Sequence, residues 1–180
     1  GPPPPLRSVA LLRLMLAWRL QADALGGLDH ETAVRCNVHS GTGTIPILLS
    51  EGARTVIGLE MAPSAIADAQ RNCQINRVTN CRFVAGDIRA TLPFIAQRPE
   101  VLIIDPPRAG MHKKVVKQVL ALSPERIVYV SCNPSTLARD LGLLKEAYQV
   151  LEVQPVDLFP HTYHIESVAR LVRKKSESCE

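Results

Sequence analysis

Short apolar runs rich in valine, isoleucine and leucine alternate with longer, mixed segments along most of this chain. The short runs are typical of β-strands, and the longer segments are typical of helices. We predict strands at Val34–His39, Arg54–Glu60, Cys81–Ala85, Val101–Asp105, Ile127–Val130, Gln149–Leu158 and Ile165–Arg173. We predict helices at Leu6–Leu25, Thr44–Leu49, Pro63–Asn76, His112–Leu122 and Pro134–Ala147.

Repeated alternation of strand and helix predicts an α/β fold, with a mostly parallel sheet and helices on both faces. The last two strands are too close in sequence for a crossover helix, so they should be antiparallel. Ligands of such sheets bind beyond the carboxyl ends of the strands. The residues expected at those ends are Ser40–Thr44, Glu60, Asp87, Asp105 and Cys132.

The two ends of the chain differ from the middle. Gly1–Pro5 contains four prolines and is expected to be a disordered leader. Three arginines interrupt the apolar run of Leu6–Leu25, which excludes an ordinary membrane span. We expect this helix to pack on the sheet, although its basic character also resembles an organelle presequence. A single folded domain is expected at residues 6–173, and residues 174–180 are expected to form a polar tail.

Composition and charge describe a folded, soluble protein. Of the 180 residues, 46% are hydrophobic and 21% are charged, and the net charge of +4 permits a polyanionic partner without requiring one. The five cysteines form no Cys-x-x-Cys pair and no cluster with metal-ligand spacing. We therefore expect free thiols in a reducing, cytoplasmic compartment and no metal. Oligomeric state is not readable from the sequence.

Cys132 is the candidate nucleophile. It follows the apolar strand Ile127–Val130 and precedes a helix that Asn133 can cap and Pro134 can begin. Backbone N–H groups at the start of a helix favour an anion, and therefore the reactive thiolate. The alternative is an ordinary buried cysteine.

Ser40-Gly41-Thr42-Gly43 is a candidate cofactor turn, because glycines let a ligand approach the backbone. Glu60, at the end of the next strand, is placed to bind ribose hydroxyls, and Asp87 is placed to reach an adenine amino group. Each has a structural alternative. The glycines could form a plain tight turn, Glu60 could be a solvated acid and Asp87 could be a turn aspartate. The third glycine of a dinucleotide motif is absent because Pro46 stands there, which favours S-adenosylmethionine over NAD.

Two further stretches carry chemistry. Asp105-Pro-Pro-Arg-Ala-Gly110 ends a strand beside the expected cofactor, and Arg108 can pair with Asp105 or hold a phosphate. Val156–Glu166 joins the last two strands and contains more polar groups than a hairpin needs. Glu166 is a candidate general base. His161 and His164 are expected to form structural hydrogen bonds rather than to bind a metal.

These motifs resemble the S-adenosylmethionine-dependent RNA uracil-5-methyltransferases, which make 5-methyluridine in tRNA or rRNA. One signature of that family matches Asp105–Gly110 followed by Ile127–Thr136, and a second matches Val156–Glu166. The resemblance covers roughly residues 11–173. It implies a Rossmann-like class I methyltransferase fold, with S-adenosylmethionine as cofactor and RNA as partner.

The resemblance also implies roles for individual residues. Cys132 would add to carbon 6 of uracil, and Glu166 would remove the proton from carbon 5. The implied cofactor contacts are His39, Gly41, Gly43, Thr44, Glu60, Asp87 and Asp105. The implied substrate contacts are Arg108, Asn133, Phe159 and His164.

The chain departs from the family pattern in its cofactor half. Asn37 replaces an aspartate, His39 replaces an aromatic residue and Thr44 replaces a common asparagine. The amino-terminal RNA-binding barrel and central domain of the family have no counterpart here. A catalytically weak S-adenosylmethionine-binding or RNA-associated module is therefore the alternative. A third interpretation takes Asp105-Pro-Pro as an exocyclic-amine methyltransferase motif, but it leaves Cys132 and Glu166 without a role.

Overall fold

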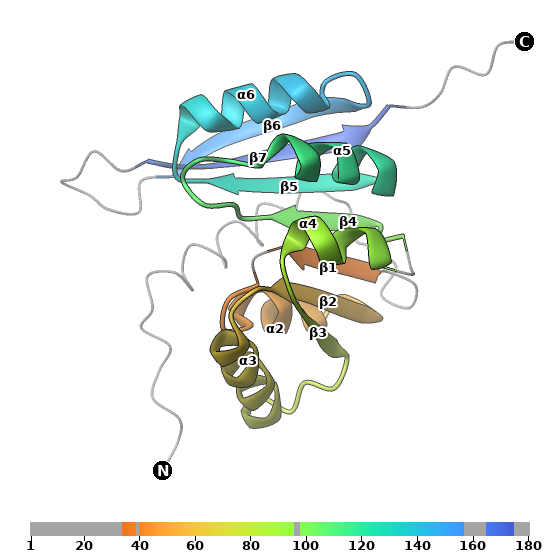
Figure 1. Cartoon of the computed structure of the whole chain (residues 1–180), viewed down its shortest axis with the longest axis vertical. Coiled ribbons are helices and arrows are strands. Elements are labelled where there is room, and N and C mark those ends of the chain that lie inside the picture. Colours follow the sequence, from red (N-terminus) through yellow and green to blue (C-terminus); the bar gives the residue numbers. More distant parts are fainter. Residues whose placement is uncertain (1–33, 39, 96–97, 157–164, 175–180) are drawn as a thin grey trace, which may run out of the picture.

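A seven-stranded sheet forms the centre of the computed structural model, which describes residues 34–38, 40–95, 98–156 and 165–174 (Figure 1). The strand order is β3-β2-β1-β4-β5-β7-β6. β1 to β5 pair in parallel, whereas β7 is antiparallel to both of its neighbours. The predicted α/β class, with its antiparallel carboxyl-terminal strand, is confirmed. The strands are β1 (Val34–Val38), β2 (Thr55–Glu60), β3 (Cys81–Ala85), β4 (Val101–Ile104), β5 (Arg126–Ser131), β6 (Tyr148–Val156) and β7 (Glu166–Arg173).

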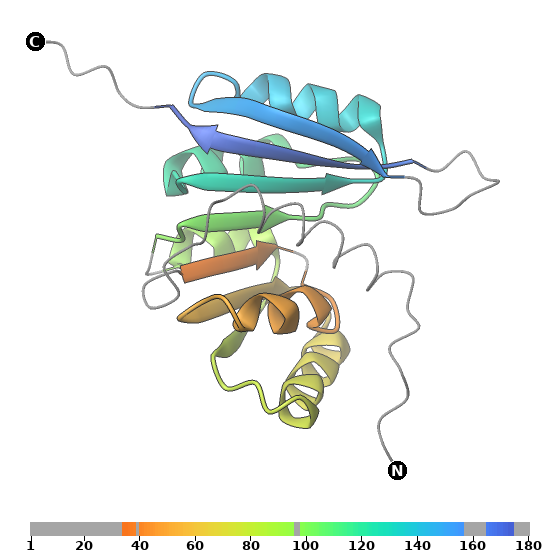
Figure 2. The same cartoon turned by 180° about the vertical axis from the view of Figure 1, so that it is seen from behind.

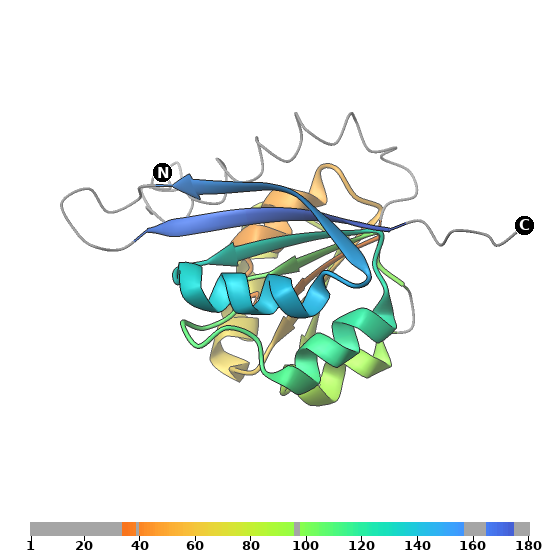
Figure 3. The ribbon, with the colours of Figure 1, turned by 90° about the horizontal axis from the view of Figure 1, so that it is seen from above.

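Helices cover both faces of the sheet. One face carries α4 (Ile88–Thr91), the 3-10 helix η1 (Leu92–Phe94), α5 (Lys113–Leu122) and α6 (Pro134–Leu144), which share one apolar core with the strands (Figure 3). α2 (Thr44–Ser50) packs on the opposite face, where Figure 2 shows it in front of the sheet. α3 (Pro63–Ile75) lies beside α2. β4 is buried at all four positions, as expected of a central strand covered on both sides.

Most predicted boundaries agree with the structure to within one residue, but α4 and η1 were not predicted. They span so few residues that no helical period is visible in the sequence. The prediction that the helix from Pro134 continues to Ala147 is wrong. The helix ends at Leu144, where the Ala147 N–H donates to the Leu144 carbonyl and the buried Tyr148 begins β6. The leader, the helix at Leu6–Leu25 and residues 175–180 of the tail lie outside the described residues.

Candidate active site

The register of β5 and β7 brings Cys132 and Glu166 to the same edge of the sheet. Ser131, the last residue of β5, pairs with Ser167 of the antiparallel β7. Cys132 directly follows Ser131 and Glu166 directly precedes Ser167, so both residues are next to this last pair at one edge of the sheet. Cys132 is partly exposed, and Glu166 is 9% exposed.

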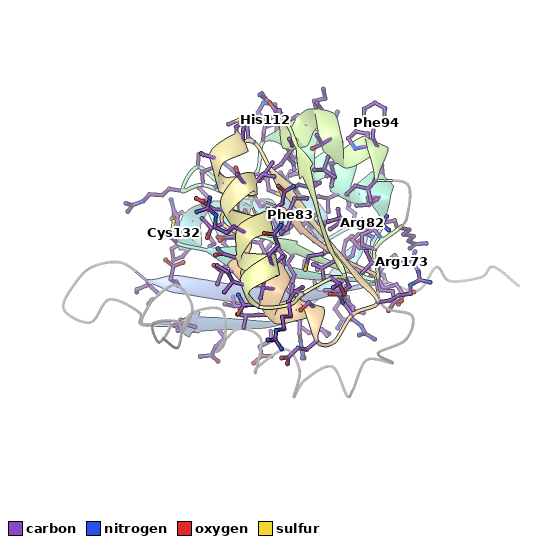
Figure 4. The ribbon with its side chains drawn as sticks, turned by 90° about the horizontal axis from the view of Figure 1, so that it is seen from below. Arg82, Phe83, Phe94, His112, Cys132 and Arg173 are labelled. Carbon is purple, nitrogen blue, oxygen red and sulfur yellow. The ribbon has the colours of Figure 1, made fainter. Side chains whose placement is uncertain are left out.

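The turn that carries Cys132 is held by its neighbours. The Ser131 hydroxyl accepts a hydrogen bond from the Asn133 N–H at 3.1 Å and donates to the Asn133 carbonyl at 3.0 Å. The Asn133 side chain accepts from the Ser135 N–H at 3.0 Å and caps α6, which begins at Pro134. The structure therefore places the sulfur at a strand-to-helix turn, as the sequence predicts, and Figure 4 shows Cys132 at the edge of the molecule.

The loop from Asp105 to Met111 is bonded to the start of α6, next to Cys132. The Arg108 carbonyl accepts from Asn133 Nδ2 at 3.3 Å and from Thr136 Oγ1 at 3.2 Å. Gly110 has φ +75°, and a Cβ there would lie 2.6 Å from Arg139 Nη2. Only glycine lets the loop approach α6 this closely. The Arg108 side chain itself is exposed.

A buried carboxylate anchors the same loop. Asp140 is 0% exposed and accepts from the Met111 N–H at 2.7 Å, from the Tyr129 hydroxyl at 2.5 Å and from Arg139 Nε at 2.8 Å. Burial and the adjacent carboxylate raise the pKa of Tyr129, so its hydroxyl stays a donor. Our sequence reasoning missed this network. The signal was Asp140 itself, because it shares the apolar face of α6 with Leu137 and Leu144.

The glycine turn after β1 is joined to the end of β2. Glu60 Oε2 accepts from the Gly41 N–H at 2.9 Å, and Oε1 accepts from Met61 N at 2.7 Å and Ala62 N at 3.0 Å. A Cβ added at Gly41 would meet no atom within 4 Å, so the backbone faces open space there. The turn and the acid that the sequence singled out are thus direct neighbours.

Gly43 is expected to tolerate no side chain. Its φ is +85°, and an added Cβ would lie 2.8 Å from Ala69 Cβ of α3. We expect Gly43→Ala to lower the free energy of unfolding by about 1–3 kcal/mol in urea titrations, because strain and overlap add. Gly142→Ala is the control, since no atom lies within 4 Å of its Cβ. That variant should be more stable by about 0.5–1 kcal/mol. If both variants changed the free energy of unfolding in the same direction, the prediction would be contradicted.

Asp87 has a structural task in this arrangement. It caps α4 by accepting from the Arg89 N–H at 2.8 Å, and its carboxylate pairs with the Arg89 side chain. Hydrogen bonds from Arg89 lower the pKa of Asp87 to about 2. These contacts match the turn-aspartate alternative, and a contact of Asp87 with adenine stays a prediction.

The structure divides the predicted site residues into two neighbouring groups. Gly41, Gly43 and Thr44 follow β1, Glu60 ends β2 and Asp87 follows β3, whereas Asp105 and Arg108 follow β4, Cys132 and Asn133 follow β5, and Glu166 begins β7. His39, Phe159 and His164 lie outside the described residues. Within the described ranges, no three His, Cys, Asp or Glu side chains gather as metal ligands. None of the helices described there is long and apolar enough to cross a membrane.

Comparison with known proteins points to one family. Residues 96–174 match the model of the tRNA (uracil-5-)-methyltransferase family. An uncharacterised RNA methyltransferase of Bacteroides thetaiotaomicron is 55% identical over 139 residues, which cover 75% of this chain and 31% of the relative. One of Nitratidesulfovibrio vulgaris is 46% identical over 84% of this chain and 33% of the relative. The chain thus spans about a third of the length of these curated relatives.

A solved structure agrees with both the fold and the family. The tRNA (uracil-54, C5)-methyltransferase of Pyrococcus abyssi, in complex with S-adenosyl-L-homocysteine, has a TM-score of 0.73 and 37% identity. It covers 87% of this chain, and this chain covers 38% of it. A precorrin-6y methyltransferase of Geobacter metallireducens has a TM-score of 0.68 at 18% identity, which supports the class I methyltransferase fold alone. In sequence and in fold the chain is thus similar to the tRNA (uracil-5-)-methyltransferase family, whose model matches residues 96–174.

Proposed function

We propose that this chain is the catalytic domain of an S-adenosylmethionine-dependent enzyme that methylates carbon 5 of a uridine in tRNA or rRNA. The observation that carries the proposal is the pairing of Ser131 with Ser167, which brings their neighbours Cys132 and Glu166 to one edge of the sheet beside the Asp105 loop. The family model names uracil-5 methylation, and the Bacteroides and Nitratidesulfovibrio relatives are named RNA methyltransferases. The Pyrococcus neighbour is a uracil C5 enzyme crystallised with S-adenosyl-L-homocysteine.

The residues around Gly41 fit S-adenosylmethionine. Gly41 has no side chain and a Cβ there would meet no atom within 4 Å, and the Glu60 carboxylate is fixed beside it by backbone N–H groups. A carboxylate held in this way is preorganised to accept the two hydroxyls of a ribose. Asp105 follows the adjacent central strand and can bind the same molecule from the other side. When bound, this cofactor supplies an electrophilic methyl group on a sulfonium.

Cys132 and Glu166 divide the remaining chemistry. The Cys132 thiolate adds to carbon 6 of uracil, which makes carbon 5 a nucleophile at the moment when a methyl acceptor is needed. After methyl transfer the Glu166 carboxylate takes the proton from carbon 5. The electron pair of that C–H bond re-forms the carbon 5–carbon 6 double bond, and Cys132 leaves as thiolate. The target base reaches this edge only if it leaves its stack.

Covalent capture tests this proposal. A fluorine at carbon 5 leaves no proton for Glu166 to remove, so RNA that contains 5-fluorouridine should remain bound to Cys132. We expect the full chain, incubated with S-adenosylmethionine and this RNA, to shift on a denaturing gel, and we expect Cys132→Ala not to shift. Cys73→Ala is the matched control, because that thiol is buried in α3. Calorimetric binding of S-adenosylmethionine without any adduct would overturn the proposal and favour the binding-module alternative.

A further inference from the structure

We propose that the exposed side of α5 carries a basic track that binds the phosphate backbone of the RNA substrate next to the catalytic edge. The track consists of Arg108, Lys113, Lys114 and Lys117, with the aromatic ring of Phe94 beside it. This inference rests on the proposed function, because it names the surface along which that RNA lies.

The charged side chains of α5 itself all have one sign. Lys113, Lys114 and Lys117 are exposed, and α5 contains no acidic residue. The charge of Lys114 acts on the Asp87 carboxylate, but Arg89 already pairs with that carboxylate. No salt bridge joins Lys113 or Lys117 to a carboxylate within the part of the chain that the structure describes. The surface therefore presents positive charge to solvent.

Folding alone does not explain three lysines at these positions. Lys113 and Lys114 occupy the first turn of α5, where the helix dipole favours carboxylates and disfavours cations. Lys113 and Lys117 are four residues apart, so their like charges face each other at a cost of about 0.2–0.5 kcal/mol. Residues that break such local rules without a folded-state partner are expected at functional sites. Bound phosphates would relieve both unfavourable terms.

The track is continuous with the catalytic edge. Arg108 lies in the loop that Asn133 and Thr136 bond to the start of α6, directly beside Cys132. The same loop leads to His112, whose ring caps α5 by accepting from the Lys114 N–H at 3.1 Å. From Lys113 to Lys117 the helix then advances about 6 Å away from that edge. A strand whose target base enters at Cys132 would therefore pass along α5.

Phe94 adds a second kind of contact. It is 85% exposed on η1, which packs against α5, and Figure 4 shows Phe94 and His112 on the same side of the molecule. An exposed ring beside a basic surface offers a platform for an unpaired base, and unpaired nucleotides flank a flipped base. A protein partner would need an apolar patch at the centre of the interface, and a single exposed phenylalanine is smaller than such a patch. This surface therefore fits RNA better than an acidic protein.

Removal of the lysine charges tests the track. We expect Lys113→Gln/Lys114→Gln/Lys117→Gln to bind a fluorescent single-stranded oligouridine at least about 10-fold more weakly than the unmodified full chain at 100 mM KCl. The slope of log affinity against log salt should fall by about 2, because three phosphate contacts on a single strand are lost. Phe94→Ala should weaken binding with an unchanged slope, since stacking releases no ions.

The matched control removes equal charge from the opposite edge of the sheet. Arg54 precedes β2, Lys145 follows α6 and Lys174 follows β7, and all three are exposed at the amino ends of the parallel strands. Their triple glutamine variant should keep at least about half of the affinity and nearly the full slope, because non-specific attraction alone is reduced. Equal losses in the two triple variants, or no measurable RNA binding by the full chain, would overturn the track.

Covalent capture separates the track from the chemistry. A trinucleotide with central 5-fluorouridine offers few phosphates to the track, so the lysine variant should capture it nearly as well as the unmodified chain does. Capture of a 20-nucleotide RNA should be slower in the lysine variant alone. Failure of the unmodified chain to capture either RNA would refute the proposed function, whereas equal capture of the long RNA by both chains would refute the track.

Discussion

Glu166→Gln is expected to leave RNA covalently attached to Cys132 even when the RNA contains ordinary uridine. Glutamine keeps the shape of the side chain but does not accept the proton from carbon 5, so the double bond does not re-form and the thiolate does not leave. Loss of a general base lowers turnover by about 10²–10⁴-fold. A denaturing gel should show the adduct, and release of methylated RNA should fall in the same experiment.

Two variants control for this result. Glu146→Gln changes an exposed glutamate in the turn after α6 and should leave turnover unchanged. The double variant Cys132→Ala/Glu166→Gln should form no adduct, because the attacking sulfur is gone. If the turnover of Glu166→Gln stayed within about threefold of that of the unmodified chain, another group would have to remove the proton from carbon 5.

Asp140→Ala is expected to cause the largest loss of stability. The change leaves the Met111 N–H and the Tyr129 hydroxyl without their acceptor inside the core, and it removes the partner of Arg139. Each unsatisfied buried donor costs about 1–3 kcal/mol, so we expect a total of about 3–5 kcal/mol in urea unfolding. At about 2–4 °C for each kcal/mol, the melting temperature should fall by about 10 °C.

Graded variants separate this anchor from a general effect of mutation. Tyr129→Phe removes one donor and keeps the ring, so it should cost about 1–2 kcal/mol. Asp68→Ala, an exposed change in α3, should stay within about 0.5 kcal/mol of the unmodified chain. Because Asp140 also holds the loop beside Cys132, covalent capture by Asp140→Asn should be slower at temperatures at which the variant stays folded. Normal capture would restrict Asp140 to a role in stability.

The strands and longer helices were predictable because their side chains carry the signal locally. The apolar runs of β2, β4 and β5 and the proline that begins α3 place these elements in the sequence to within a residue. Asn133 was expected to cap α6, and it does. Short elements lack such a signal. α4 begins because Asp87 accepts from the backbone two residues later, and η1 continues it for only three residues.

Residue type and position along the chain were enough to propose Cys132, Glu60 and the Asp105 loop as site residues, because a nucleophile, a ribose-binding acid and a rigid turn each need a particular side chain at the end of a strand. Sequence could not decide that β7 enters the sheet between β5 and β6, since strand order depends on long-range hydrogen bonding. That pairing brings Glu166 to the same edge of the sheet as Cys132, because Ser131 pairs with Ser167. Tertiary packing likewise made Asp140 an anchor. Burial excludes water from the Met111 N–H and the Tyr129 hydroxyl, so these donors depend on the Asp140 carboxylate as their acceptor.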